Sequence, residues 1–269
     1  MKTTKRSICT NLIVVLTLLG SLIAPALAEE EGMNAEEDTW TQIGVYGLFL
    51  GIEGDARLNQ VTTDMDVSFD DIWDNLEGAF MGFVEHRRER WSFIGDVAYL
   101  KLEADRTVAS TPGPLPVSVT LDAEAEQLML EGFVGYRLLT QDLKDARLGI
   151  DLLGGARYSD IEIELDSRAT LLGLTRSASR NKSADTVDGV IAVRVEYSHN
   201  NGWGLTGWAD IGEGSDSRSH QLFGGVNYTF KNNVRLHAGY RLVNLDYDGN
   251  SFEYDLDYAG PQIGLAYRF

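Results

Sequence analysis

The chain ends on the sequence Y-A-G-P-Q-I-G-L-A-Y-R-F, residues 258–269. Counting back from Phe269, every second residue is apolar or aromatic, through Tyr267, Leu265 and Ile263, while small or polar residues stand between them. A period of two indicates a β-strand with one apolar and one polar face. A terminal aromatic residue is typical of a strand that ends at a membrane interface, where aromatic rings form a girdle. The stretch therefore predicts a membrane-spanning β-strand.

The beginning of the chain reads as a secretory signal peptide over residues 1–28. Lys2, Lys5 and Arg6 supply the positive start, and a run of apolar residues leads from them to A-L-A at residues 26–28. Small residues in that spacing are typical of a signal-peptidase cleavage site. We therefore expect the chain to be exported and the signal to be removed.

Cleavage would leave a short disordered leader, residues 29–39, and one barrel domain, residues 40–269. The single cysteine, Cys9, lies within the signal, so the mature domain would have no thiol chemistry. The mature chain would hold 20 basic and 41 acidic residues, a net charge of −21. Such an acidic chain repels phosphates, which argues against a nucleic-acid partner. Beyond the signal there is no run of about 18 apolar residues, the length that a membrane-spanning helix needs.

The domain reads as about ten segments with period-two alternation, so we predict an all-β fold, a transmembrane antiparallel up-and-down β-barrel. Eight or twelve strands remain open, because residues 53–76 and 165–185 read as long connections that could hide or extend a hairpin. A proline-rich stretch at residues 111–116 is predicted to be a turn. The predicted strands are residues 40–52, 78–85, 91–103, 121–139, 147–164, 187–197, 203–211, 221–230, 234–247 and 258–269.

Short and long connections alternate, as they do in outer-membrane barrels, whose short turns face the periplasm. Trp40, Trp91 and Trp203 each begin a strand beside a short turn and predict an aromatic girdle there. A soluble β-sandwich would show the same alternation with its charged face in water. The signal peptide, the tryptophans and the terminal aromatic favour the barrel. The predicted short turns are residues 86–90, 141–145, 199–202 and 231–233.

If the apolar faces meet lipid, the polar faces line the interior of the barrel. Isolated buried charges are costly, so the charged groups inside must be paired or hydrated. We favour a salt-bridged lumen, because side chains can fill a barrel of this size. The alternative is an open polar channel whose charged rings select solutes. The charged residues predicted to line the lumen are Glu131, Asp151, Arg157, Arg194, Glu196, Asp210 and Arg241.

No residue is predicted to be catalytic, to bind a cofactor or to bind a metal. Residues 69–76, F-D-D-I-W-D-N-L, predict a short helix that covers the barrel mouth, capped by Asp70 or Asp71. Of the four histidines, only His220 falls at the predicted outer rim, beside Ser219. A single rim histidine more often belongs to plain surface than to a hydrolase site, which needs an organised nucleophile and base.

The run V-S-F-D-D-I-W-D-N-L-E-G-A-F-M-G, residues 67–82, resembles a segment of a family of uncharacterised proteobacterial outer-membrane β-barrel proteins. The later segments G-V-N-Y-T-F, L-H-A-G-Y-R-L-V-N-L-D-Y-D and G-P-Q-I-G-L-A-Y-R-F resemble the last strands of these proteins and of opacity-type, OmpA-like barrels. The resemblance covers most of the mature chain and implies a fold and a location, but no reaction. It also implies that Phe269, Tyr267 and Leu265 form a signal read by the barrel-assembly machinery.

These features predict an integral protein of the bacterial outer membrane, non-enzymatic, with a structural or surface role. A narrow passive channel for small polar solutes is the alternative. A hydrolase with an active site at the rim is a third, less favoured reading. The expected partners are outer-membrane lipids, lipopolysaccharide and the barrel-assembly machinery, and the oligomeric state is open.

Overall fold

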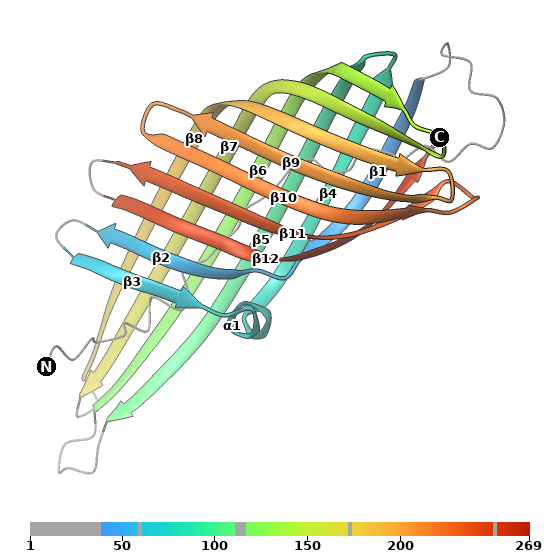
Figure 1. The fold of residues 1–269 in the computed structure, drawn as a ribbon. Helices are drawn as coiled ribbons and strands as arrows, with labels where there is room; N and C mark the ends of the chain where they lie inside the picture. Colours follow the sequence, from blue (N-terminus) through green and yellow to red (C-terminus); the bar gives the residue numbers. More distant parts are fainter. Residues whose placement is uncertain (1–38, 59–60, 111–116, 172–173, 250–251) are drawn as a thin grey trace, which may run out of the picture.

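The computed structural model describes residues 39–58, 61–110, 117–171, 174–249 and 252–269 (Figure 1). The predicted signal peptide, the leader up to residue 38 and the proline-rich connection lie outside the described residues. Twelve strands and one short helix, α1 (Phe69–Asp74), make up the described chain. The strands are β1 (Thr39–Leu48), β2 (Gly51–Leu58), β3 (Val61–Val67), β4 (Leu76–Arg88), β5 (Trp91–Ser110), β6 (Val117–Asp142), β7 (Ala146–Leu171), β8 (Leu174–His199), β9 (Trp203–Glu213), β10 (Ser217–Thr229), β11 (Val234–Asp248) and β12 (Phe252–Arg268).

All the strands belong to one antiparallel sheet in the order β1-β4-β5-β6-β7-β8-β9-β10-β11-β12, and β12 pairs back with β1 to close it. Ten strands therefore form a closed barrel, as predicted. The hairpin of β2 and β3 lies outside this ring and pairs with the far part of β12. The closing pair runs from Gln42 opposite Arg268 to Leu48 opposite Gln262, so the C-terminal stretch does form the last strand of the barrel.

Residues alternate between the two faces of every strand, because successive side chains of a strand point in opposite directions. On β8, Ile191 is 61% exposed on the outside while Arg194 is 0% exposed on the inside. Exposed apolar side chains form an outer band along the same length of the other strands. The band includes Val45, Val84, Phe93, Leu130, Val134, Leu152, Leu205, Leu222, Leu236, Leu242 and Leu265. A barrel with an apolar outside and a charged inside is a transmembrane β-barrel.

Tight turns join the strands at one end of the barrel, which we call the short-turn end; the C-terminus lies at the same end (Figure 1). The four predicted short turns are all found there. Gly202 has φ of +91°, a conformation that favours glycine, and a Cβ at this position would lie 2.7 Å from the carbonyl oxygen of Thr229. Aromatic pairs edge the apolar band at this end: Trp91–Tyr136, Trp203–Tyr228 and Tyr267–Phe269.

Trp40 is not part of this girdle, contrary to the prediction. Its side chain is buried inside the barrel, under the guanidinium groups of Arg268 and Arg87, at 4.5 and 5.6 Å from the ring. The reason is its place in the alternation of β1, in which Ile43 and Val45 face outward and Trp40 and Gln42 face inward.

The opposite end of the barrel, the long-strand end, extends far beyond the apolar band. Strands β6, β7 and β8 have 26 residues each, whereas about 9–11 tilted residues cross a bilayer. Residues 165–185, read as a long connection that could hide or extend a hairpin, do extend one: β7 continues to Leu171 and β8 begins at Leu174. The predicted strands 203–211 and 221–230 are likewise extended, because β9 ends at Glu213 and β10 begins at Ser217. Residues 53–76 hide a hairpin, one of the alternatives left open, and residues 40–52 divide into β1 and β2.

The inside of the long-strand end is apolar. Fifteen buried residues, from seven strands and the segment between β1 and β2, form one cluster there, which we call the outer core. The described chain has no helix long and apolar enough to cross a bilayer. The outer core consists of Leu50, Ile52, Val67, Ala98, Leu100, Leu102, Ala125, Met129, Ile161, Ile163, Val243, Leu245, Tyr254, Leu256 and Tyr258.

Candidate functional site

The barrel wall is incomplete where β1 and β4 part. β1 pairs with β4 only along residues 39–45, opposite residues 88–82. Beyond that level, residues 46–48 of β1 pair with β12, and residues 76–81 of β4 face β5, with a register shift between Leu76 and Gly78. Within the described ranges no strand joins residues 46–48 of β1 to residues 76–81 of β4 by pairing with both segments. We call the interval between these two strand segments the wall gap.

Helix α1 lies at the wall gap, between the end of β3 and the start of β4 (Figure 1). The predicted helix is therefore confirmed, but its predicted place over the barrel mouth is wrong. Its cap is Ser68 rather than an aspartate: the Ser68 hydroxyl accepts a hydrogen bond from the backbone N–H of Asp71 at 3.2 Å, and the Asp71 carboxylate accepts one from the backbone N–H of Ser68 at 3.2 Å. This reciprocal capping box satisfies N–H groups that a short helix leaves open.

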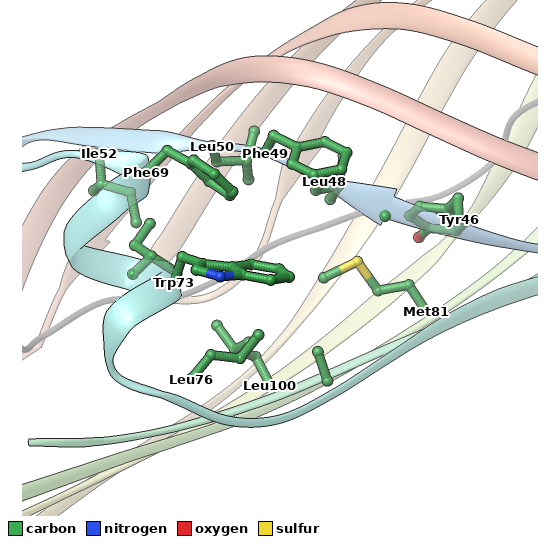
Figure 2. A pocket seen from close by; sticks show the side chains of 13 residues that line it. Tyr46, Leu48, Phe49, Leu50, Ile52, Phe69, Trp73, Leu76, Met81 and Leu100 are labelled. Carbon is green, nitrogen blue, oxygen red and sulfur yellow. The ribbon is translucent and has the colours of Figure 1, made fainter.

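A cavity of about 260 Å³ lies between α1 and the two strand edges, and we call it the wall pocket. Figure 2 shows the Trp73 indole in the middle of it, with residues of β1, β2 and the segment between them on one side and residues of β4 and β5 on the other. Every lining side chain is apolar or aromatic. The lining residues are Tyr46, Gly47, Leu48, Phe49, Leu50, Ile52, Phe69, Ile72, Trp73, Leu76, Ala79, Met81 and Leu100.

An aromatic chain holds α1 against the wall. The Phe49 and Phe69 rings lie 5.3 Å apart between centroids, and the Phe69 and Trp73 rings lie 5.9 Å apart. Trp73 nevertheless remains 60% exposed. Trp73 therefore exposes a large aromatic surface beside an apolar cavity, and a ligand could cover this surface.

The lumen holds two clusters of ion pairs, both nearer the short-turn end than the outer core. The first, the inner cluster, joins three carboxylates to three guanidinium groups from β4, β6, β7 and β8. Asp151 accepts from Arg194 at 2.6 Å and from Arg87 at 2.8 Å, and it also pairs with Arg137. The cluster consists of Glu85, Arg87, Arg137, Asp151, Arg194 and Glu196.

The second group, the middle cluster, surrounds Arg157 of β7. Its guanidinium pairs with Glu131, lies 3.2 Å from Asp210 and donates to the Ser219 hydroxyl at 2.7 Å. The Trp208 indole N–H donates to Asp210 at 2.6 Å. Each carboxylate therefore has a partner in the lumen, which buried charges require.

Other polar contacts and an apolar layer complete the filling of the lumen. The Tyr46 hydroxyl donates to Asp96 at 2.9 Å, and Arg241 lies over the rings of Tyr46 and Phe223 at 5.8 and 5.7 Å. Close to the middle cluster, seven buried residues pack into one apolar layer. These are Ile94, Phe133, Leu153, Val190, Ala192, Trp208 and Phe223.

The structure places all seven charged residues predicted for the lumen on its inner face, each at most 5% exposed. Glu85 and Arg87 were not predicted to line the lumen, because Glu85 ends a predicted strand and Arg87 falls in the predicted turn at residues 86–90. Their shared parity with the inward Phe83 was the signal that could have found them. The residues of the proposed assembly signal, Phe269, Tyr267 and Leu265, are 64%, 50% and 50% exposed on the outer face.

The histidines do not assemble into a site. His220 is exposed on β10, and the neighbouring Ser219 is buried on the opposite face, where it bonds to Asp188 and Arg157. His237 is buried inside the barrel beside Gln262. The described part of the chain holds no group of three or more His, Cys, Asp or Glu residues arranged to bind a metal ion.

No protein-family model matches the chain, and no curated protein matches it either. Among solved structures, the outer membrane protease OmpT from Escherichia coli is 14% identical, with 86% of this chain and 97% of that chain covered and a TM-score of 0.49. The translocator domain of the autotransporter NalP from Neisseria meningitidis is 12% identical, with coverages of 86% and 89% and a TM-score of 0.38. Ail, the attachment invasion locus protein of Yersinia pestis, is 11% identical, with coverages of 86% and 97% and a TM-score of 0.31. These likenesses carry no argument about function, and the resemblance to opacity-type barrels stays a prediction.

Proposed function

We propose that the protein is a non-enzymatic outer-membrane barrel with a closed lumen, which presents a rigid extension at the cell surface. The exposed apolar band supports the location. Along β8 it runs over the nine residues from Val187 to Val195. About 9–11 residues of a tilted strand cross a bilayer, so the band has the length of a membrane-spanning segment.

The lengths of the connections support the orientation. In outer-membrane barrels the short turns face the periplasm, so the long-strand end lies outside the cell. In this orientation some 15 residues of each of the strands β6, β7 and β8 lie outside the membrane. Measured along the strand, that part is roughly 50 Å long. A sheet of this length is a structural or surface element.

The inner cluster is the observation that best supports a closed lumen. Its members come from strands on different sides of the barrel, and Arg194 of β8 reaches both Asp151 of β7 and Glu85 of β4. Side chains that are 0–12% exposed and bonded across the lumen obstruct the path of a hydrated ion. A narrow channel for polar solutes, the alternative, would need these bonds to open.

Single-channel conductance in a planar bilayer tests this proposal. The full chain is refolded into lipid, and its insertion is verified by the altered gel mobility of the folded barrel before current is recorded. We expect inserted protein to give no stable conductance steps. Stable, ion-selective steps from the same preparation would reject the closed lumen and establish the channel.

Recognition by the barrel-assembly machinery is a separate part of the proposal. Deleting Phe269 removes an exposed terminal ring and the N–H and C=O that bond to Thr41 of β1. We expect slower assembly and a lower yield in the outer membrane, measured by fractionation. Replacing Phe230, another exposed aromatic at the short-turn end, with alanine is the matched control and should leave the yield unchanged. Normal membrane levels of the truncated protein would contradict the assembly role.

A further inference from the structure

We propose that the wall pocket binds an uncharged apolar molecule of about a dozen non-hydrogen atoms, which enters from the lipid through the wall gap. The inference rests on the membrane location proposed above, and it does not depend on whether the lumen conducts. The size follows from the cavity of about 260 Å³. A dry cavity of about 150 Å³ holds a benzene molecule, so this one admits a ligand about twice as large.

The lining selects an apolar ligand. The side chains that surround the Trp73 ring are those of Leu50, Leu76, Met81 and Leu100, with the Phe49 ring above them (Figure 2). Two polar side-chain groups belong to the lining: the Tyr46 hydroxyl, which is already bonded to Asp96 in the lumen, and the Trp73 indole N–H. A polar ligand would lose its hydration here and find few partners in return.

The wall gap supplies the entrance. β4 lacks β1 as a partner from residue 81 to residue 76, and the exposed Phe80 of this segment pairs with Tyr99 of β5. Tyr99 in turn lies opposite Leu128, just beyond the exposed Leu130 of the apolar band. The opening therefore lies at the outer margin of the band, where an apolar molecule dissolved in the outer leaflet meets it.

Charge around the entrance excludes anionic ligands. Residues 53–77, from β2 to the start of β4, contain eight acidic residues and one basic residue. Asp70, Asp74 and Glu53 are exposed beside lining residues, while Glu77 is paired with Lys101 at 3.0 Å. Like charges repel across this rim, so the carboxylate of a fatty acid or the phosphate of a lipid headgroup is disfavoured.

The ligand cannot pass from the wall pocket into the lumen, because the packed outer core lies behind the pocket. Leu50, Ile52 and Leu100 belong both to the wall pocket and to the outer core. The ligand therefore remains among apolar side chains, and the packed outer core and the two clusters of ion pairs lie beyond it. The arrangement holds a molecule and does not conduct it.

The test measures binding of the uncharged fluorophore 1-naphthylamine, whose size matches the pocket, to the full chain refolded in detergent micelles. The pocket-filling variant is Gly47→Leu, because Gly47 lines the pocket and a Cβ there would lie 3.8 Å from the Phe49 ring, without a clash. Gly224→Leu is the matched control: it makes the same change in a strand, but a Cβ at Gly224 meets no atom within 4 Å. Altered gel mobility verifies that each variant folds.

We expect saturable binding of one fluorophore per chain, weakened at least tenfold by Gly47→Leu and unchanged by Gly224→Leu. The anionic fluorophore 1-naphthoate, which has nearly the same size, should bind at least tenfold more weakly than the uncharged fluorophore. Non-saturating partition, or equal loss in both variants, would overturn the site. Equal affinity for the two fluorophores would overturn the choice of an uncharged ligand. Neither result bears on conductance, so this proposal and the closed lumen fail separately.

Discussion

Side chains alternate between the two faces at both ends of strand β7, but the outer face is apolar at one end and charged at the other. In the membrane-spanning part, the exposed Leu152 faces lipid while the buried Asp151 faces the inner cluster. In the long-strand end, the exposed Glu162 faces water while the buried Ile163 faces the outer core. The same inversion occurs on β6, where the outward residue changes from Leu130 to Glu124. The molecule is thus a membrane barrel at one end and a water-soluble β-structure at the other.

Backbone geometry determines which face of a strand a side chain takes, and the surrounding medium determines whether that face is apolar or charged. Along β7 the inward side chains recur at every second position, from Asp151 and Leu153 through Arg157 to Ile161 and Ile163. In lipid, apolar side chains on the outer face are favourable, so the charged groups are confined to the lumen, where they must pair. In water, apolar side chains are favourable on the inner face, as in any globular core.

Replacing Arg194 with alanine should have the largest effect. It leaves Glu85 with Arg87 alone at 3.8 Å and removes one of three partners of Asp151, all of them inside the lumen. Breaking a buried ion pair costs about 3–5 kcal/mol. The free energy of unfolding in lipid vesicles, measured by urea titration, checks this loss, and a change below 1 kcal/mol would show that the inner cluster is hydrated.

An arginine on the outside should distinguish the two ends directly. Val134→Arg places a charge near the middle of the apolar band and should cost about 2–4 kcal/mol. Glu162→Arg makes the corresponding change in the long-strand end, where Glu162 faces Glu126 across the sheet, and it should cost nothing or stabilise slightly. Urea unfolding of both variants in the same vesicles is the measurement. Equal costs would mean that the band does not face lipid.

A small cavity in the outer core should have a moderate effect. Ile163→Val removes one methylene group from a side chain that is 6% exposed, and such changes cost about 0.5–1.5 kcal/mol. The same measurement applies. The isosteric exchange Ile163→Leu, which keeps the volume, serves as the control and should cost less. A loss below about 0.3 kcal/mol in Ile163→Val would indicate that the outer core is loosely packed.

The smallest effect concerns the carboxylates on the outside of the long-strand end. Burial, and then the nearby Asp185 and Glu162, raise the pKa of Asp160. A carboxyl whose pKa is raised by folding opposes folding while it is ionised, so its cost disappears as the pH falls through that pKa. Asp160→Asn should therefore stabilise the protein by up to about 0.5 kcal/mol at neutral pH and by nothing at about pH 3. Destabilisation at neutral pH would contradict the repulsion.

The sequence by itself determined the barrel. Alternation marked the ten strands, turn residues marked the four short turns, and the inward parity marked the charged residues of the lumen. These signals are local, because a side chain's face depends only on its position along the strand. Local signals also explain the reading of residues 165–185: this segment is rich in serine and arginine and shows no clear apolar alternation, so it reads as a connection although most of it belongs to β7 and β8.

Only the tertiary structure decided what each face meets and where the wall opens. The wall gap exists because β12 pairs with β1 at one end and with β2 at the other, contacts between residues some 200 positions apart in the chain. The wall pocket follows from that gap, since α1 fills a place that no strand occupies. The bonds of Arg194 to Asp151 and Glu85 likewise depend on the closure of the sheet. Pairing between distant segments leaves no mark in the alternation of either, and this is the physical reason why the sequence could not show these features.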